Sequence, residues 1–344
     1  MKWCKWLICL VIVFLAGCYE TEGSHTQPLI SPSGTPLKMI IPPGADLPTA
    51  KRIVLGFSQL GSESTWRAAN TESIKAAARE AGISLIMKNA EQSQQKQIEA
   101  IRSFMERKVD IIAIAPVVQT GWDDILEEVK QAGIPVIILD RSIHVNDPSL
   151  YVTGIGSDFF EEGVKAAKYM LDKMRHRSGQ INIAELQGTI GSTPSIDRGR
   201  GFRETIKDRN NYRITLTRPA DFTKAGGRKV MREFLDQPEE EWPQVLFSHN
   251  DDMAIGAVEA IEEAGLKPGT DIIIISVDGT RRAFEQMIAG NINAVVECNP
   301  LLGPLLMQAT QEIMSGRTLP KRMVPAEDIF PQELAAMEVG NRTY

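Results

Sequence analysis

Cysteine is scarce in this chain, and the few that occur leave no pair for a disulfide bond. The four cysteines are Cys4, Cys9, Cys18 and Cys298. Three of them lie in a segment that we expect to be removed or modified, so Cys298 would remain alone even in an oxidising compartment. We expect Cys298 to be a buried small apolar side chain and not a nucleophile.

An excess of positive charge is also missing. The chain has 38 lysine and arginine residues against 44 aspartate and glutamate residues, a net charge of −6. With no long basic run, this balance argues against a nucleic-acid partner. His144, His176 and His249 show no ligand spacing, and we expect neither a metal nor a cofactor. No repeat of 20–50 residues indicates a solenoid.

The N-terminus has the pattern of a secretory signal peptide. Lys2 and Lys5 precede an apolar run over 7–14, and small residues follow it. A membrane-spanning helix needs about 20 apolar residues, so this run is too short. Leu-Ala-Gly-Cys at 15–18 resembles the bacterial lipoprotein signal, in which the cysteine is lipidated. We therefore predict a lipoprotein signal peptide over 1–17 and a lipid anchor on Cys18, the only attachment to a membrane.

The segment that follows Cys18 is rich in serine, threonine, proline and glycine and has no periodic apolar pattern. Such a composition favours a disordered tether, which we place at 18–50.

From residue 51 onward, apolar runs alternate with helical patterns. Continuous runs such as Ile-Ile-Ala-Ile predict strands buried on both faces, as in a parallel sheet. The length exceeds one five- or six-stranded sheet, so we predict an α/β fold with two doubly wound parallel-sheet lobes. Predicted strands are 52–58, 83–88, 110–115, 135–139, 181–186, 212–217, 245–248, 272–277 and 293–296, and predicted helices are 64–81, 94–107, 122–132, 158–177, 196–208, 224–235 and 251–264.

Polar and aromatic clusters follow several predicted strands or open helices. Ligands of such sheets bind beyond the carboxyl ends of the strands. Asp251 and Asp252, which open a predicted helix, are expected to be caps. The candidate binding residues are Glu63, Trp66, Arg67, Asp140, Arg141, Arg198, Phe222, Asn250, Asp278 and Glu297.

The charges of these candidates nearly balance, with four acids against three arginines. A phosphate or carboxylate ligand would require uncompensated cations, whereas a neutral ligand rich in hydroxyls can donate to carboxylates and accept from guanidinium groups. Trp66 and Phe222 could lie against the apolar faces of a sugar ring, although either could instead be ordinary core.

The same residues resemble those of periplasmic sugar-binding proteins of the ribose/galactose type, which are substrate-binding proteins of ABC transporters. The resemblance runs from residue 51 to the C-terminus. It rests on Asp140-Arg141, Arg198, Pro-Ala-Asp-Phe at 219–222, Asn-Asp-Asp-Met at 250–253 and Asp278-Gly279. Departures are the anchor, the tether, Thr193-Pro194 before Arg198, and the C-terminal tail.

Longer strings resemble the galactofuranose-binding members of this family. They are Gly-Phe-Ser-Gln at 56–59, Gly-Ser-Glu-Ser-Thr-Trp-Arg at 61–67, Ala-Pro-Val-Val at 115–118, Thr-Gly-Trp at 120–122, Glu-Leu-Gln-Gly-Thr at 185–189 and His-Asn-Asp-Asp-Met at 249–253. The resemblance implies a sugar held between two lobes joined by three crossovers, and delivery to the permease of an ABC importer. We expect a monomer with lobes 51–153 plus 298–323 and 154–297 plus 324–344.

Three other functions are alternatives to the capture of a sugar for transport. A transcription regulator would need a DNA-binding motif where this chain has a signal and tether. A glycoside hydrolase needs one carboxyl group with a raised pKa, whereas a candidate arginine near each acid is expected to lower its pKa. A receptor subunit that reports sugar to a kinase or chemoreceptor would have the same binding site, and this alternative stays open.

Overall fold

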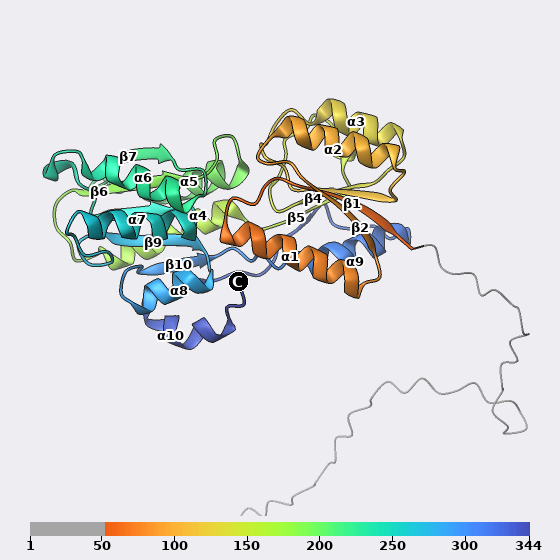
Figure 1. The fold of residues 1–344 in the computed structure, drawn as a ribbon. Coiled ribbons are helices and arrows are strands. Elements are labelled where there is room, and N and C mark those ends of the chain that lie inside the picture. Colours follow the sequence, from red (N-terminus) through yellow and green to blue (C-terminus); the bar gives the residue numbers. More distant parts are fainter. Residues whose placement is uncertain (1–51) are drawn as a thin grey trace, which may run out of the picture. The chain divides into compact units, whose positions relative to one another are not determined.

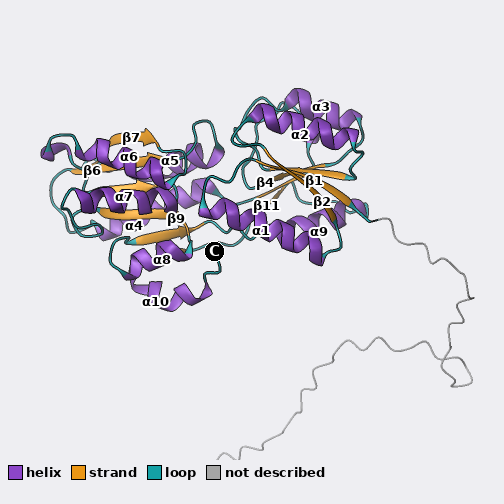
Figure 2. Cartoon of the chain, viewed as in Figure 1, coloured by secondary structure: helices purple, strands orange, loops and turns teal. Residues whose placement is uncertain are grey.

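A computed structural model describes residues 52–344 of the chain. The predicted signal peptide, Cys18 and the tether lie outside the described residues. Two six-stranded sheets, each with helices on both faces, form two lobes (Figures 1 and 2). This confirms the predicted α/β fold class. Within residues 52–344 no helix is long and apolar enough to cross a membrane.

The first sheet is parallel throughout, in the order β11-β5-β4-β3-β1-β2. Every residue of β3 and β4 is buried, as expected for strands covered on both faces. The strands are β1 (Val54–Gln59), β2 (Ser84–Asn89), β3 (Ile111–Ile114), β4 (Val136–Leu139), β5 (Thr153–Ile155) and β11 (Arg322–Met323).

The second sheet has the order β12-β10-β9-β8-β6-β7. It departs from the predicted parallel arrangement at one edge, where β12 runs antiparallel to β10. The strands are β6 (Ile181–Gln187), β7 (Tyr212–Pro219), β8 (Val245–Ser248), β9 (Ile273–Asp278), β10 (Ala294–Glu297) and β12 (Ile329–Pro331).

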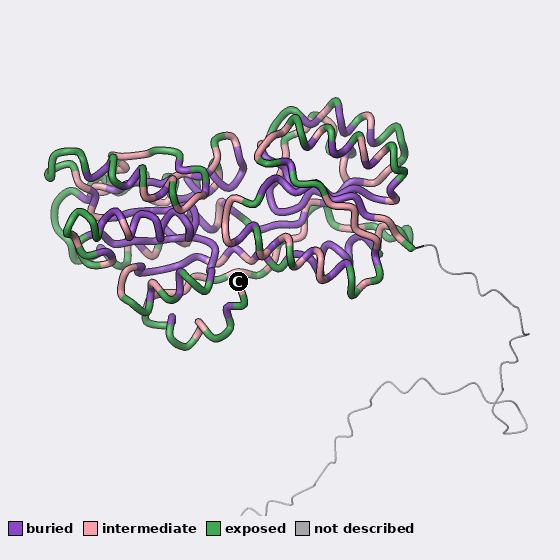
Figure 3. Tube along the Cα trace, viewed as in Figure 1, coloured by how far each residue is buried: buried purple, intermediate pink, exposed green. Residues whose placement is uncertain are grey.

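Apolar side chains of alternating orientation attach helices to both faces of the first sheet. Leu55 and Phe57 pack with α1 (Thr65–Glu80) and α9 (Gly303–Met314). Ile112 and Ile114 pack on the opposite face with α2 (Gln94–Glu106) and α3 (Asp123–Gln131). The buried residues concentrate in the strands and in the helix faces turned toward them (Figure 3).

The second lobe repeats this layering. Helices α4 (Phe159–Lys173) and α5 (Thr193–Ile206) cover one face of its sheet. The other face carries α6 (Lys224–Leu235), α7 (Asp251–Glu263) and α8 (Arg281–Ile288), with α10 (Ala335–Glu338) packed beside α8. Short 3₁₀ turns occur at Pro148–Leu150, Glu239–Glu241, Gln332–Leu334 and Val339–Asn341.

The chain passes between the two sheets at residues 156–158, 298–302 and 324–328. The first crossing begins later than predicted, because Gly154 and Ile155 belong to β5 and pair with β4 and β11 of the first sheet. The sequence patterns also missed the strands β5, β11 and β12 and the helices α8, α9 and α10.

Helix α5 begins at Thr193, three residues before the predicted start. Pro194 lies in its first turn. Main-chain nitrogens there have no acceptor within the helix, so a proline costs no hydrogen bond. Pro194, which departs from the family pattern, is therefore compatible with helix α5, and Arg198 remains buried.

Candidate functional site

A small, partly open cavity lies where the carboxyl ends of β4, β8 and β9 meet the amino ends of α1 and α5. Both lobes contribute to its wall, as expected for doubly wound sheets. It is lined by Glu63, Ser64, Trp66, Arg67, Asp140, Arg141, Phe159, Pro194, Arg198, Phe222, Asn250, Asp278 and Cys298.

All the predicted binding residues lie in this wall except Glu297. The Glu297 carboxylate instead accepts a hydrogen bond from Nη1 of Arg342 at 2.6 Å. The guanidinium carbon of Arg342 lies over the adjoining rings of Phe284 and Phe330, at 4.6 and 4.3 Å from their centroids. The C-terminal tail, which the sequence could not place, thus holds Glu297 outside the cavity.

Arg67 joins two acids of the first lobe into one charged chain. Its Nη2 donates to Oδ2 of Asp140 at 2.7 Å, and its Nε donates to Oε1 of Glu63 at 3.2 Å. Burial alone would lower the pKa of Arg67, but the carboxylates of Asp140 and Glu63 outweigh it and raise that pKa. The guanidinium group also lies 4.6 Å from the centroid of the Trp66 ring.

Arg141 is held by the main chain and by an aromatic ring. Its Nη1 donates to the main-chain oxygen of Val117 at 2.8 Å, and its guanidinium carbon lies 5.4 Å from the Phe222 ring centroid. Burial, together with the nearby charge of Arg67, lowers the pKa of Arg141 to about 10. The group is therefore still cationic at neutral pH.

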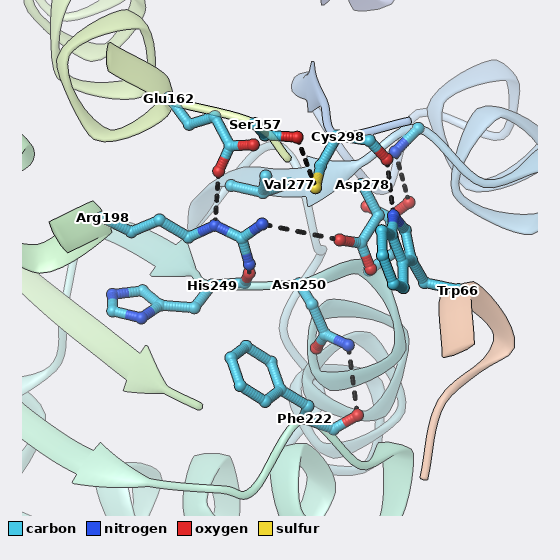
Figure 4. A network of polar contacts seen from close by, with 12 residues as sticks. Trp66, Ser157, Glu162, Arg198, Phe222, His249, Asn250, Val277, Asp278 and Cys298 are labelled. Atoms are coloured by element: carbon cyan, nitrogen blue, oxygen red, sulfur yellow. Dashed lines mark hydrogen bonds and ion pairs between the residues drawn. The ribbon is translucent and has the colours of Figure 1, made fainter. Parts of the chain in front are cut away.

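The Phe222 ring takes the space that a side chain at residue 188 would fill. A Cβ added to Gly188 would lie 1.8 Å from Cζ of Phe222. Asn250 fixes the same segment, because its Nδ2 donates to the main-chain oxygen of Phe222 at 3.1 Å (Figure 4). The glycine and the amide together set the position of the ring in the cavity.

Arg198 enters the cavity from the second lobe with its charge already compensated (Figure 4). Its Nε donates to Oε2 of Glu162 at 2.6 Å, its Nη1 donates to the main-chain oxygen of His249, and its Nη2 lies 3.9 Å from Oδ1 of Asp278. Burial would lower the pKa of Arg198, but the nearby carboxylates raise it. A close approach of α4 to α5 allows the pairing, since a Cβ at Gly163 would lie 2.1 Å from the Arg198 oxygen.

Asp278 forms the end of β9, and a neighbouring acid fixes its turn. The Asp251 carboxylate accepts from Ser276 Oγ at 2.6 Å and from the main-chain nitrogens of Gly279 and Thr280 at 3.0 and 2.8 Å. Burial and the Asp251 charge raise the pKa of Asp278 well above its usual range. This corrects the expectation that a nearby arginine lowers the pKa of every candidate acid.

Asp251 and Asp252 are not the caps that the sequence suggested. The cap of α7 is Asn250, whose Oδ1 accepts from the main-chain nitrogen of Met253 at 3.0 Å. Asp251 holds the turn after β9, and Asp252 bonds to Thr65 of the first lobe.

Three residues of the cavity wall have a strained backbone conformation. Asp140, Phe222 and Asp278 have positive φ angles of 63°, 60° and 129°. Each such conformation costs a non-glycine residue about 1–3 kcal/mol and persists where surrounding contacts require it. Strain at these positions is consistent with side chains placed for binding.

Trp66 belongs to a helix of the first lobe but is part of the buried apolar cluster of the second lobe, which also contains Phe159 and Phe202. Its Nε1 donates to the main-chain oxygen of Cys298 at 2.6 Å (Figure 4). Cys298 is buried, as predicted, and burial raises the pKa of its thiol well above the usual range.

Sequence reasoning missed Ser64, Phe159, Pro194 and Cys298 as parts of the wall. Cys298 directly follows β10, so the search beyond strand ends could have found it. Phe159 follows a crossing after β5, a strand of only three residues that leaves no apolar pattern.

Within residues 52–344, one group of side chains has metal-ligand types within 4.8 Å of one another: Glu162, Cys298 and Glu327. These groups already have protein partners. Arg198 binds Glu162, and Oε1 of Glu327 accepts from Ser157 Oγ at 2.6 Å and from the main-chain nitrogen of Asn299 at 2.8 Å. The cluster therefore joins the three crossings between the lobes.

Comparison with known proteins shows extensive similarity. The sequence profile of the periplasmic binding protein domain matches residues 55–318. The chain is 42% identical to the galactofuranose-binding protein of Escherichia coli K12 over 276 residues. The aligned region covers 80% of this chain and 86% of that protein.

Solved structures show the same similarity. A protein from Mycobacterium smegmatis in complex with β-D-fucofuranose has a TM-score of 0.82 and 48% identity, covering 85% of this chain and 95% of that one. The binding protein of the arabinose ABC transporter from Shewanella sp. ANA-3, bound to α- and β-L-arabinofuranose, has a TM-score of 0.81 and 46% identity over 84% and 95%. The chain therefore belongs to the periplasmic binding protein family, whose members are extracytoplasmic solute-binding proteins and not enzymes.

Proposed function

We propose that the protein captures a neutral furanose in this cavity and delivers it to an ABC importer. Four buried polar atoms of the wall carry the proposal, because none has a hydrogen-bond partner within the protein. Oε2 of Glu63 is an acceptor, and Nη1 of Arg67 and Nε of Arg141 are donors. Oδ2 of Asp278 accepts when the carboxyl group is ionised and can donate when, as its raised pKa favours, the group holds a proton. A sugar hydroxyl both donates and accepts, so a polyol can satisfy this mixed set.

The charges of the wall support a neutral ligand. Three carboxyl groups line the cavity together with three guanidinium groups. Arg198 and Arg67 are already paired with carboxylates of the protein, so Arg141 is the one guanidinium group of the wall that an anionic ligand would find without a carboxylate partner. The rings of Trp66 and Phe222 offer apolar surface for the faces of a sugar ring.

The ligands named for the relatives share one ring. D-Galactofuranose, D-fucofuranose and L-arabinofuranose have the same configuration at C2, C3 and C4, and they differ in the arm attached at C4. A cavity wall complementary to that ring would bind all three sugars, and contacts with the arm would set their relative affinities. Galactofuranose is our first candidate, because Glu63 and Arg67 can bind the hydroxyls of its longer arm.

Nuclear magnetic resonance with ¹³C-labelled D-galactose tests the proposal directly, because the carbon shifts of the bound sugar report its ring size. Calorimetric titration of residues 51–344 with galactose, fucose, arabinose and ribose provides the affinities. We expect a bound furanose and tighter binding of galactose than of ribose, after correction for the furanose fraction of each sugar. A bound pyranose would refute the furanose assignment, and a protein that binds none of the four sugars would refute the function.

Anchoring and delivery form the remaining part of the proposal. The Leu-Ala-Gly-Cys segment supports acylation of Cys18, with more than one acyl chain because a single chain binds a membrane only marginally. Cys18→Ser should release the protein from the membrane fraction or block its processing, and unchanged fractionation and mass would contradict the anchor. Loss of galactose uptake in a deletion strain would support delivery to an importer, whereas intact uptake with a lost transcriptional or chemotactic response would indicate a receptor subunit.

A further inference from the structure

A carboxylate of the second lobe binds the amino end of a helix in the first lobe. Oδ2 of Asp252 accepts from the main-chain nitrogen of Thr65 at 2.6 Å, and its Oδ1 accepts from the Thr65 hydroxyl at 3.1 Å. Asp252 is 7% exposed and is not part of the cavity wall. Residues next to the contact on both segments are in the wall, since Ser64 and Trp66 flank Thr65 and Asn250 lies two residues before Asp252.

The amino end of α1 needs such a partner. The first main-chain nitrogens of a helix have no acceptor within the helix, and a carboxylate placed there is also favoured by the helix dipole. Ser64, the cap of α1, accepts from the nitrogen of Arg67 at 3.1 Å, which leaves the nitrogen of Thr65 to the opposite lobe. Separation of the lobes would return both groups to water.

The other rim of the cleft is joined differently. The main-chain nitrogen of Gln119 donates to the oxygen of Gly191 at 3.0 Å, and the nitrogen of Ser142 donates to the Thr193 hydroxyl at 3.1 Å. Asp252 is thus the charged side chain that ties the rim beside α1.

We propose that Asp252 determines ligand affinity without touching the ligand, by latching the second lobe onto the amino end of α1 when the lobes close. The predicted effect of the latch on affinity rests on the proposed sugar binding, whereas the contact between Asp252 and Thr65 does not. Because the latched form is the one that encloses the sugar, loss of the latch should speed dissociation. It should change the affinity for every sugar by the same factor.

Two substitutions break the latch from opposite sides. Asp252→Ala removes the acceptor. Thr65→Pro removes both donors at the first position of α1, where proline is compatible with a helix, and Ser64 before it already has the extended conformation that proline requires (φ −139°, ψ 161°). Asp124→Ala is the matched control, because Asp124 is likewise the second residue of a helix that opens with two aspartates, but it is exposed.

The expected result is a rise of about tenfold in the dissociation rate of radiolabelled galactose for either latch variant, with the association rate unchanged. The double variant should release galactose no faster than either single variant, because both substitutions remove the same interaction. The ratio of dissociation constants for galactose and arabinose should stay at the wild-type value. Unchanged affinity, multiplied effects in the double variant, or an altered ratio would each overturn the latch.

Hydrogen exchange at the Thr65 amide tests the latch without any sugar. Asp252→Ala should accelerate this exchange relative to the wild type and to Asp124→Ala, while the melting temperatures of the two alanine variants stay close. An unchanged exchange rate would overturn the latch. Failure of the wild type to bind sugar would refute the proposed function alone.

Discussion

Replacement of Arg67 by alanine should weaken sugar binding and also reduce the preference for a longer exocyclic arm. Arg67 is 3% exposed and pairs with Asp140 and Glu63, which are also largely buried. Removal of one partner of a buried pair costs about 3–5 kcal/mol of stability. A domain near the middle of the typical range, with a free energy of unfolding of about 10 kcal/mol, keeps about 5–7 kcal/mol after such a loss and remains folded.

The effect on binding comes from Nη1 of Arg67, which is buried and has no partner within the protein. A hydrogen bond from a charged group contributes about 1.5–3 kcal/mol, so its loss should raise the dissociation constant for galactofuranose by about 10- to 150-fold. Arabinofuranose lacks the last carbon of the arm and its hydroxyl, so it should lose less. The ratio of the two dissociation constants should therefore fall toward one.

This ratio separates the arm contact from a general disturbance of the site. A displaced Asp140 would weaken both sugars by a similar factor and leave the ratio unchanged. Arg102→Ala is the control, because Arg102 pairs with Glu128 at the surface and such pairs contribute about 0–1 kcal/mol. Calorimetric titration of the three proteins with both sugars, at a temperature below unfolding, gives the constants. An Arg67→Ala protein that binds both sugars more weakly but keeps the wild-type ratio would refute the assignment of Arg67 to the arm.

Three further predictions follow from single residues. Asp278→Ala should raise the dissociation constant of every sugar at least tenfold in calorimetry, because Asp278 lines the cavity and its buried Oδ2 has no partner within the protein, so we expect every bound sugar to contact it; an effect on one sugar alone would contradict this. Burial raises the pKa of Glu327 from 4.5 to about 8, so the folded protein holds this proton more tightly than the unfolded chain, and the contribution of Glu327 to stability falls as the pH rises from about 4.5 to 8. Glu327→Gln cannot ionise and keeps the acceptor for Ser157, so its melting temperature should exceed that of the wild type at pH 8.5 and match it near pH 4.5; a difference independent of pH would argue against this linkage. Gly188→Ala should displace the Phe222 ring and weaken sugar binding, whereas unchanged titrations would show that the ring can move without cost.

Much of the fold was predictable because parallel strands covered on both faces leave a simple signal. Runs such as Ile111–Ile114 are entirely apolar, and helices with glycine beyond their ends separate them. The pattern fails where the strands shorten. β5 and β11 have three and two residues, too few for any periodicity, and their place at one edge of the first sheet follows from pairing between distant segments.

The candidate site was predictable where topology alone places a residue. Asp140, Asn250 and Asp278 lie at the ends of strands, and parallel strands bring these ends to one edge. Glu297 satisfies the same rule, yet it lies outside the cavity because Arg342, 45 residues later, binds it. The sequence around Glu297 cannot predict this partner, because the contact depends on how the C-terminal tail packs.

The position of Trp66 between the lobes has an optical consequence. Its indole is carried by α1 of the first lobe, packs in the core of the second and donates to Cys298 in a crossing between them. Trp122 is buried within the first lobe and Trp242 packs against the second, so neither spans the joint. Any opening of the lobes must change the polarity around Trp66, while the other two indoles keep their surroundings. Residues 52–344 thus place an intrinsic fluorophore at the joint between the lobes, and we expect the emission of Trp66 to report ligand capture in real time without a label.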